Sequence, residues 1–179
     1  MLFKKLPQQW QPVKPTAGSV IQRYGKQHED GFHGIQYFNT QQVDRFLESE
    51  HELYRLIRPE RRHLWTISYM SINMPIPPHI DSGVRTVINC YGDTARAVTR
   101  FHHKQRDVVK QIQIANQTDG HIYDDKDLII VDQFRAEPGD IYMLAVDQIH
   151  SVATQTDQER WAICFSSKQS MLEAQKDLA

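Results

Sequence analysis

The sequence is poor in cysteine and has neither a long hydrophobic run nor an excess of charge of either sign. Its 179 residues include 2 cysteines, Cys90 and Cys164, and no apolar stretch approaches the roughly 20 residues that a membrane span needs. The N-terminal residues also lack the hydrophobic core of a secretory signal. We therefore expect a cytoplasmic protein with reduced thiols and no membrane partner.

The balance of charge and the composition exclude several further classes of protein. Lysine and arginine number 21 and acidic residues 22, so no field of the whole molecule draws the chain to phosphate backbones, and we expect no nucleic-acid partner. Hydrophobic residues at 40% and charged residues at 24% are ordinary for a globular protein and exclude collagenous, low-complexity and wholly disordered chains. The 9 histidines stand out, so a metal site is the first function to look for.

The length fits one domain of about 150 residues with a short extension. We expect a single domain over residues 1–179, made of N-terminal strands, loops and a helix (1–63), a β-rich core (64–168) and a tail (169–179). Within the first part, the segment from Trp10 to Gly34 is a candidate lid.

Two kinds of hydrophobic spacing divide the chain. Between Gln41 and Arg58, apolar residues recur at threes and fours, after a candidate N-cap at Thr40 and before Pro59, which predicts an amphipathic helix. Beyond Leu64 this period disappears, and short β-branched and aromatic runs alternate with turn signals. The predicted strands are Trp65–Asn73, Arg85–Tyr91, Val98–Phe101, Val108–Ala115, Leu128–Phe134, Ile141–Val146 and Arg160–Ser166, with turns at Tyr91-Gly92-Asp93, Thr118-Asp119-Gly120 and Glu137-Pro138-Gly139-Asp140. Such a succession without alternating helices predicts a mainly β sandwich, jelly roll or barrel.

His79 and Asp81 form the first candidate for chemistry. They follow Met74-Pro75-Ile76-Pro77-Pro78, a segment too rich in proline to be helical. In an extended segment, residues two apart point to one face about 6.6 Å from each other, so an imidazole and a carboxylate can bind one ion. By itself, a His-x-Asp in a chain with 9 histidines is as readily explained by chance.

His150 and Arg160 strengthen this interpretation. His150 comes just after a predicted strand, and Arg160 opens the last one ten residues later. Two histidines and one carboxylate on one face of a metal are typical of non-haem Fe(II) oxygenases. An arginine one hairpin away can bind the distal carboxylate of a dicarboxylic acid bidentately.

With these residues, the segment from Trp65 to Ser166 resembles the Fe(II)/2-oxoglutarate-dependent dioxygenase superfamily, in particular its short prolyl-hydroxylase-like, phage and bacterial members. His79, Asp81 and His150 match the facial triad, Arg160 matches the residue that holds the cosubstrate, and Tyr69 matches a tyrosine that hydrogen-bonds the same carboxylate. The resemblance implies a double-stranded β-helix, a distorted jelly roll on which we expect the N-terminal helix to pack.

The resemblance also implies an activity: oxidative decarboxylation of 2-oxoglutarate to succinate and CO2, coupled through Fe(II) and O2 to hydroxylation of a C–H bond. Two departures from the family pattern narrow the implied activity. Ala162 stands where many members have Ser or Thr, so the extra hydroxyl is expected from Tyr69, and Ser166 stands where members that repair alkylated bases have a second arginine. The substrate is then a peptide side chain or a small molecule, and the sequence does not choose between them.

Alternation along the strands extends the candidate site. From Arg160 to Ser166, the even positions are small or polar and the odd ones bulky, so we expect the even face to border the ligand and the odd face to pack. Carrying the parity of His79 and Asp81 forward places Arg85, Val87, Asn89 and Tyr91 on the ligand side, unless Ser82-Gly83 inserts a bulge. Asn89 is thus a further cosubstrate-binding candidate. Arg85 is either another one or part of a surface salt bridge.

Other residues have simpler interpretations. Of His102 and His103, at most one can join a given site, because neighbours on a strand face opposite sides, and we expect an exposed strand end. Cys90 and Cys164 are expected in the core or the pocket wall. Two other functions stay open: a triad oxygenase that does not use 2-oxoglutarate, and a non-catalytic double-stranded β-helix that serves as a binding module.

Overall fold

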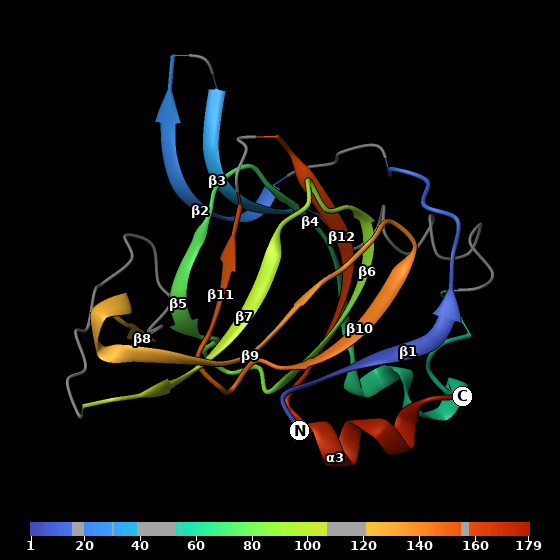
Figure 1. Cartoon of the computed structure of the whole chain (residues 1–179). Helices are drawn as coiled ribbons and strands as arrows, with labels where there is room; N and C mark the ends of the chain where they lie inside the picture. Colours follow the sequence, from blue (N-terminus) through green and yellow to red (C-terminus); the bar gives the residue numbers. More distant parts are fainter. Residues whose placement is uncertain (16–19, 30, 39–52, 54, 107–120, 155–157) are drawn as a thin grey trace.

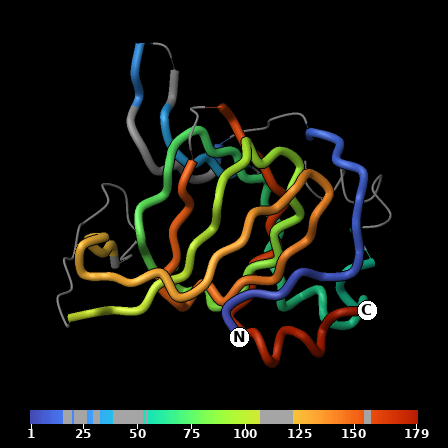
Figure 2. Tube along the Cα trace, viewed as in Figure 1, coloured from blue at the N-terminus to red at the C-terminus, as the bar shows by residue number. Residues whose placement is uncertain are grey.

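Two antiparallel sheets face each other in the computed structural model, which describes residues 1–179 apart from 16–19, 30, 39–52, 54, 107–120 and 155–157 (Figures 1 and 2). The larger sheet has the strand order β1-β10-β6-β12-β4-β3-β2 and the smaller one β8-β5-β11-β7-β9. The strands are β1 Phe3–Gln9, β2 Val20–His28, β3 Gly31–Phe38, β4 Thr66–Ile72, β5 Ile76–Ile80, β6 Thr86–Asp93, β7 Val98–Lys104, β8 His121–Ile122, β9 Leu128–Arg135, β10 Asp140–Ala145, β11 His150–Ala153 and β12 Arg160–Ser167.

The order of these strands is that of a double-stranded β-helix. From β4 to β12 the chain crosses repeatedly between the sheets, so that β4, β12, β6 and β10 lie together in one and β5, β11, β7 and β9 in the other. Each sheet buries one face against the other, which explains the period-two alternation of the strands. The mainly β, jelly-roll fold expected from the sequence is confirmed.

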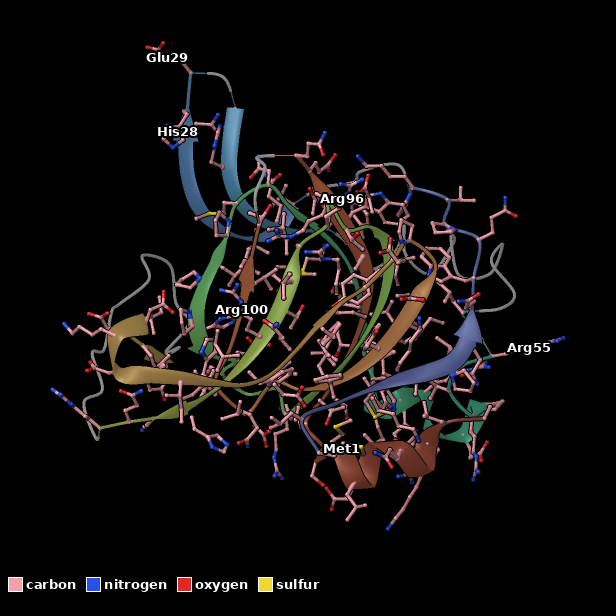
Figure 3. All side chains as sticks on the ribbon, viewed as in Figure 1. Met1, His28, Glu29, Arg55, Arg96 and Arg100 are labelled. Atoms are coloured by element: carbon pink, nitrogen blue, oxygen red, sulfur yellow. The ribbon has the colours of Figure 1, made fainter. Side chains whose placement is uncertain are left out.

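The N-terminal strands widen the larger sheet at both edges. β1 pairs with β10, and its irregular register between Lys5 and Gln9 spans Pro7, which an edge strand tolerates because it needs no amide on its free side. The β2–β3 hairpin pairs with β4 and projects from the barrel, with His28 and Glu29 near its tip (Figures 1 and 3). The first forty residues therefore form longer strands than their irregular pattern suggests.

The helix expected between residues 41 and 58 lies almost entirely outside the described residues. Of that range, Leu53, Leu56 and Ile57 are described and buried in the core. The chain then forms a 3-10 helix, η1, over Pro59–Leu64.

Most of the described core strands agree with the predicted ones, with four differences. β5, β8 and β11 were not among the predicted strands, and the turn expected at Tyr91-Gly92-Asp93 is wrong, because β6 continues to Asp93. The chain turns at Ala95 and Arg96 instead, where φ is 44° and 55°. The Glu137–Asp140 turn is confirmed by the bond from the Asp140 amide to the Glu137 carbonyl at 3.0 Å. Val108–Ala115 and Thr118-Asp119-Gly120 lie outside the described residues.

The hydrophobic core has two layers, one on each face of the larger sheet. Between the sheets lie Ala162 and Cys164 of β12 with Val87, Phe101, Phe134, Tyr142 and Leu144. On the outer face, Ile163 and Phe165 pack with Ile88, Leu56 and residues of the C-terminal helix α3 (Met171–Ala174). The parity expected for the last strand is therefore confirmed.

The C-terminal segment packs against η1 through a buried carboxylate. Asp177, at the end of the 3-10 helix η3 (Gln175–Asp177), is fully buried and accepts hydrogen bonds from Arg61 Nε at 2.7 Å, Trp65 Nε1 at 3.0 Å and the Gln169 amide. No helix among the described residues is long and apolar enough to cross a membrane.

Candidate metal and cosubstrate site

His79, Asp81 and His150 come together at one end of the barrel. His79 lies on β5 and pairs with His150, the first residue of β11, and Asp81 follows β5 directly. One ligand atom from each lies within 4.8 Å of the others, and His79 Nε2 is 3.2 Å from Asp81 Oδ1. The sequence-predicted triad is thus brought together as one cluster.

Backbone carbonyls fix the orientation of both imidazoles. His79 Nδ1 lies 2.8 Å from the Pro77 carbonyl oxygen, and His150 Nδ1 lies 2.9 Å from that of Gln148. A carbonyl oxygen can only accept, so each Nδ1 carries the proton and leaves Nε2 as the ligand atom of the neutral ring. Such hydrogen bonds behind a ligating histidine are common at metal sites.

The two imidazoles differ in pKa because their neighbours differ. Burial and the adjacent His79 lower the pKa of His150 to about 4, so its ring is neutral at physiological pH. Burial also acts to lower the pKa of His79, but the hydrogen bond and charge of Asp81 outweigh it and raise that pKa. Burial acts to raise the pKa of Asp81, and contact with His79 together with the nearby His150 lowers it. The cluster therefore offers one carboxylate and two nitrogen donors.

Arg160 is a buried cation with an unsatisfied donor. It begins β12, is 6% exposed, and donates from Nη2 to the Met74 carbonyl at 2.7 Å. Its Nη1 is buried without a partner, and no carboxylate among the described residues forms an ion pair with it. Burial lowers the pKa of Arg160 to about 10, which still leaves it charged at neutral pH.

A cavity of about 840 Å³ joins the triad to Arg160. Its wall includes the even positions of β12 and the alternate β6 residues Val87, Asn89 and Tyr91, as the parity argument predicts. Asn89 donates from Nδ2 to the Tyr91 hydroxyl at 3.4 Å, and its Oδ1 is buried without a partner in the described part of the chain. Asn89 Oδ1 and Arg160 Nη1, two buried polar atoms without a hydrogen-bond partner in the described part of the chain, thus belong to residues that line the same cavity.

Tyr69 is not part of this cavity. It pairs with Ile163 of β12, and directly opposed residues of neighbouring strands share a face, so Tyr69 lies with Ile163 on the outer face. There it packs against Phe38 and Trp161 in the outer layer of the core. The role expected for Tyr69, a hydrogen bond to the cosubstrate, requires the other face of the sheet. Tyr91, a residue that the parity argument placed on the ligand side without assigning it a role, does line the cavity, as does Tyr37 of β3.

Of the remaining candidates, Cys164 lines the cavity, and the others lie outside its wall. Arg85 forms a salt bridge with Asp147 at 3.0 Å, the simpler of its two interpretations. His103 is exposed as expected, but His102 is buried and its Nε2 lies 2.8 Å from Ser151 Oγ. Cys90 is in the outer core and Cys164 in the cavity wall, as expected, and burial raises the pKa of both thiols.

Comparison with known proteins gives remote similarities of structure. No family model matches the sequence, and no curated protein does. EvdO2 from Micromonospora carbonacea var. aurantiaca, solved with 2-oxoglutarate, is similar over 92% of this chain and 86% of its own, with 15% identity and a TM-score of 0.49. The α-ketoglutarate-dependent epimerase SnoN from nogalamycin biosynthesis is similar over 81% of this chain, with 14% identity and a TM-score of 0.46. Hazelnut (Corylus avellana) vicilin is similar over 87% of this chain, with 10% identity and a TM-score of 0.41.

The chain spans 66% of SnoN and 35% of vicilin. All three similarities are too remote to assign an activity or a substrate to this chain.

Proposed function

We propose that this chain is an Fe(II)- and 2-oxoglutarate-dependent dioxygenase that hydroxylates a C–H bond of a peptide side chain or a small molecule and releases succinate and CO2. The observation that carries the proposal is Arg160, a buried cation that has no acidic partner among the described residues and lines the same cavity as the His79–Asp81–His150 cluster. Burying a charge without a counter-ion is costly, so an anionic ligand is expected there.

The donor set of the cluster fits a divalent iron ion. His79 and His150 would each supply Nε2 of a neutral ring, and Asp81 would supply one carboxylate oxygen. Three ligands of this kind leave coordination positions open and a net charge near +1 with a divalent ion, which favours an anionic 2-oxo acid. When bound, iron and the cosubstrate supply the oxidising chemistry, and the protein supplies binding and orientation.

The chain's own residues would hold the cosubstrate by its distal carboxylate. Arg160 Nη1 is the free donor for it, and the Tyr91 hydroxyl and the Asn89 side chain belong to the same cavity wall. Between Arg160 and the triad, Ala162 and Cys164 present small side chains, which leave room for a five-carbon dicarboxylate. Pairing with this carboxylate would offset the cost of burying the charge of Arg160. It would also orient the 2-oxo group toward the metal ligands.

Binding of 2-oxoglutarate to Arg160 tests the proposal. Anaerobic protein with Fe(II) is titrated with 2-oxoglutarate while the visible charge-transfer absorbance of a chelated 2-oxo acid is followed. Losing one partner of a buried pair costs roughly 3–5 kcal/mol, so Arg160→Ala should need at least a hundredfold more cosubstrate. Arg160→Lys should lose less, because it keeps the charge without the fork. Arg85→Ala, which removes an arginine outside the cavity, is the matched control.

Metal binding is measured on the same variants. Titration of the metal-free protein with Mn(II) should show one site that Asp81→Ala abolishes and Arg160→Ala leaves intact. If Asp81→Ala binds the metal as the parent does, the triad assignment is wrong, and a non-catalytic binding module becomes the better interpretation. If Arg160→Ala develops the absorbance at the same 2-oxoglutarate concentration as the parent, Arg160 does not hold the cosubstrate. A triad oxygenase that uses another reductant then becomes the better interpretation.

A further inference from the structure

The cavity continues beyond the triad, away from Arg160. Backbone hydrogen bonds run from Asp81 to Val146, from Val146 to Arg85 and from Arg85 to Ser167, so Asp81 is linked to the end of β12 opposite Arg160. At this end the cavity is lined by residues of η1, β4, the segment after Asp81 and the residues around the end of β12. We call this region the triad mouth; it comprises His63, Leu64, Thr66, Ser82, Gly83, Val84, Ser166, Ser167, Lys168 and Gln169.

Hydroxyl groups of the triad mouth are available to a ligand. Thr66, Ser82 and Ser166 make no side-chain hydrogen bond to any described residue, in contrast to Ser167, whose Oγ accepts from the backbone amide and the side chain of Gln169. These hydroxyls, on β4, on β12 and after β5, can donate to or accept from a polar molecule. Thr66 and Ser82 are exposed and Ser166 is half-buried, so a wholly apolar substrate that covered them would displace their water without replacing its hydrogen bonds.

None of the described residues that form the triad mouth is acidic, and three aspartates near it are engaged with other residues, whereas Lys168 is not. Asp81 belongs to the metal cluster, Asp147 pairs with Arg85, and Asp177 is buried among Arg61, Trp65 and Gln169. Lys168 lines the cavity, is exposed, and has no carboxylate within ion-pair distance among the described residues. The charge left free at this end of the cavity is therefore positive.

The backbone on both sides of Lys168 is fixed. The Ser167 carbonyl accepts from the Arg85 amide at 2.9 Å, and the Gln169 carbonyl accepts from Thr86 Oγ1 at 2.8 Å. The Gln169 side chain is in turn held by Asp177. Lys168 thus stands at a defined place in the wall.

We propose that the triad mouth selects a polar small molecule carrying an anionic group, a carboxylate or a phosphate, which pairs with Lys168 while its neutral polar part meets the free hydroxyls. The inference rests on the proposed function, in which 2-oxoglutarate lies between Arg160 and the triad, and it adds that the substrate reaches the triad from the opposite end. It disfavours basic peptides, because Lys168 would repel them, and wholly apolar substrates.

Matched pairs of compounds test this selectivity without turnover. Protein loaded with Zn(II) and 2-oxoglutarate is screened by ligand-observed NMR against lactate and lactamide, N-acetylglycine and its amide, and nucleoside and sugar monophosphates with their dephosphorylated forms. The anionic member of at least one pair should bind at least tenfold more tightly than its neutral partner. Lys168→Ala should remove that preference, a loss of about tenfold or more. Lys168→Arg should keep it, and Lys176→Ala, an exposed lysine outside the cavity wall, should leave it unchanged.

Three outcomes overturn the proposal: equal binding of charged and neutral members, an unchanged preference in Lys168→Ala, or no anionic binder at millimolar concentration. Calorimetry of 2-oxoglutarate on the same metal-loaded samples separates this failure from that of the proposed function. If 2-oxoglutarate binds but the preference is absent, the substrate class alone is wrong. If 2-oxoglutarate does not bind, the proposed function is wrong whatever Lys168 does.

Discussion

Tyr69 and Tyr91 lie on opposite faces of the larger sheet, and this difference predicts different effects on cosubstrate binding. Tyr91 lines the cavity with Arg160, whereas Tyr69 packs in the outer core. Tyr91→Phe should weaken 2-oxoglutarate binding about tenfold, the loss expected for one hydrogen bond to a charged group. Tyr69→Phe should leave it unchanged. The anaerobic titration of Fe(II)-loaded protein measures both.

Metal affinity is the control for this comparison, since neither hydroxyl belongs to the metal cluster. Mn(II) should bind both variants as it binds the parent. A weakening of 2-oxoglutarate binding by Tyr69→Phe and none by Tyr91→Phe would show that the faces are assigned the wrong way round.

Some site residues could be placed from the spacing within one strand, whereas others depended on how two strands align. His79 and Asp81 are two apart on one extended segment, and Arg160 begins a strand whose alternation is clear, so local spacing predicted their faces. Their grouping with His150 as one site also depended on the resemblance to a known family. Tyr69 required knowledge of how β4 aligns with β12. That register is set by the packing of two strands far apart in the sequence, and a shift of one residue reverses the face.

Proline concealed β5 among the elements of the core. β5 contains Pro77 and Pro78, which donate no amide, and its register with β11 shifts between His150 and Val152. The segment was therefore correctly read as extended but not as a strand of the smaller sheet. Strands with regular alternation, such as β12, were predicted almost to their ends.

Gly92 allows β6 to pass beneath Trp161, and its replacement tests this contact between elements. The register of β12 on β6 shifts between Trp161 and Ala162, and a Cβ at position 92 would overlap the Trp161 ring. Gly92→Ala should therefore destabilise the protein by about 1–3 kcal/mol, the range for overpacking a filled site. Urea unfolding at neutral pH measures the difference in free energy.

A double-mutant cycle distinguishes overlap from a general effect of the strand. In a Trp161→Ala background the ring is absent, so Gly92→Ala should cost much less. An equal cost in both backgrounds would mean that Gly92 is needed for its backbone and not for the space that Trp161 fills.

At the scale of the whole molecule, the two sheets contribute different residues to the proposed site. The smaller sheet carries both histidines on adjacent strands, whereas Arg160, Asn89 and Tyr91 all come from the larger sheet. A ligand between Arg160 and the triad would therefore contact both sheets. Composition and periodicity predicted the fold class, but the pairing of β1 with β10 joins segments separated by much of the chain, and no local pattern specifies such a pair.

Asp177 joins the C-terminal segment to η1 and to the end of β12, so its charge should contribute to the stability of the whole domain in a pH-dependent way. Burial acts to raise the pKa of Asp177, but the hydrogen bonds from Gln169, Arg61 and Trp65 outweigh it and lower that pKa. A lowered pKa adds stability above the unfolded value of about 3.9, and this stability is lost as the pH falls through the folded pKa.

Asp177→Asn should cost roughly 1.5–3 kcal/mol at pH 7, where charged hydrogen bonds are lost. The difference from the parent should begin to shrink as the pH falls below about 3.9, and it should be lost only below the lowered folded pKa, where the parent's carboxylate is also neutral. Urea unfolding from pH 3 to pH 7 measures it, with Glu60→Gln, an exposed acid of η1, as a control that should stay near the parent throughout. A difference that is the same at pH 3 and pH 7 would mean that the shape of the side chain, and not its charge, holds the C-terminal segment in place.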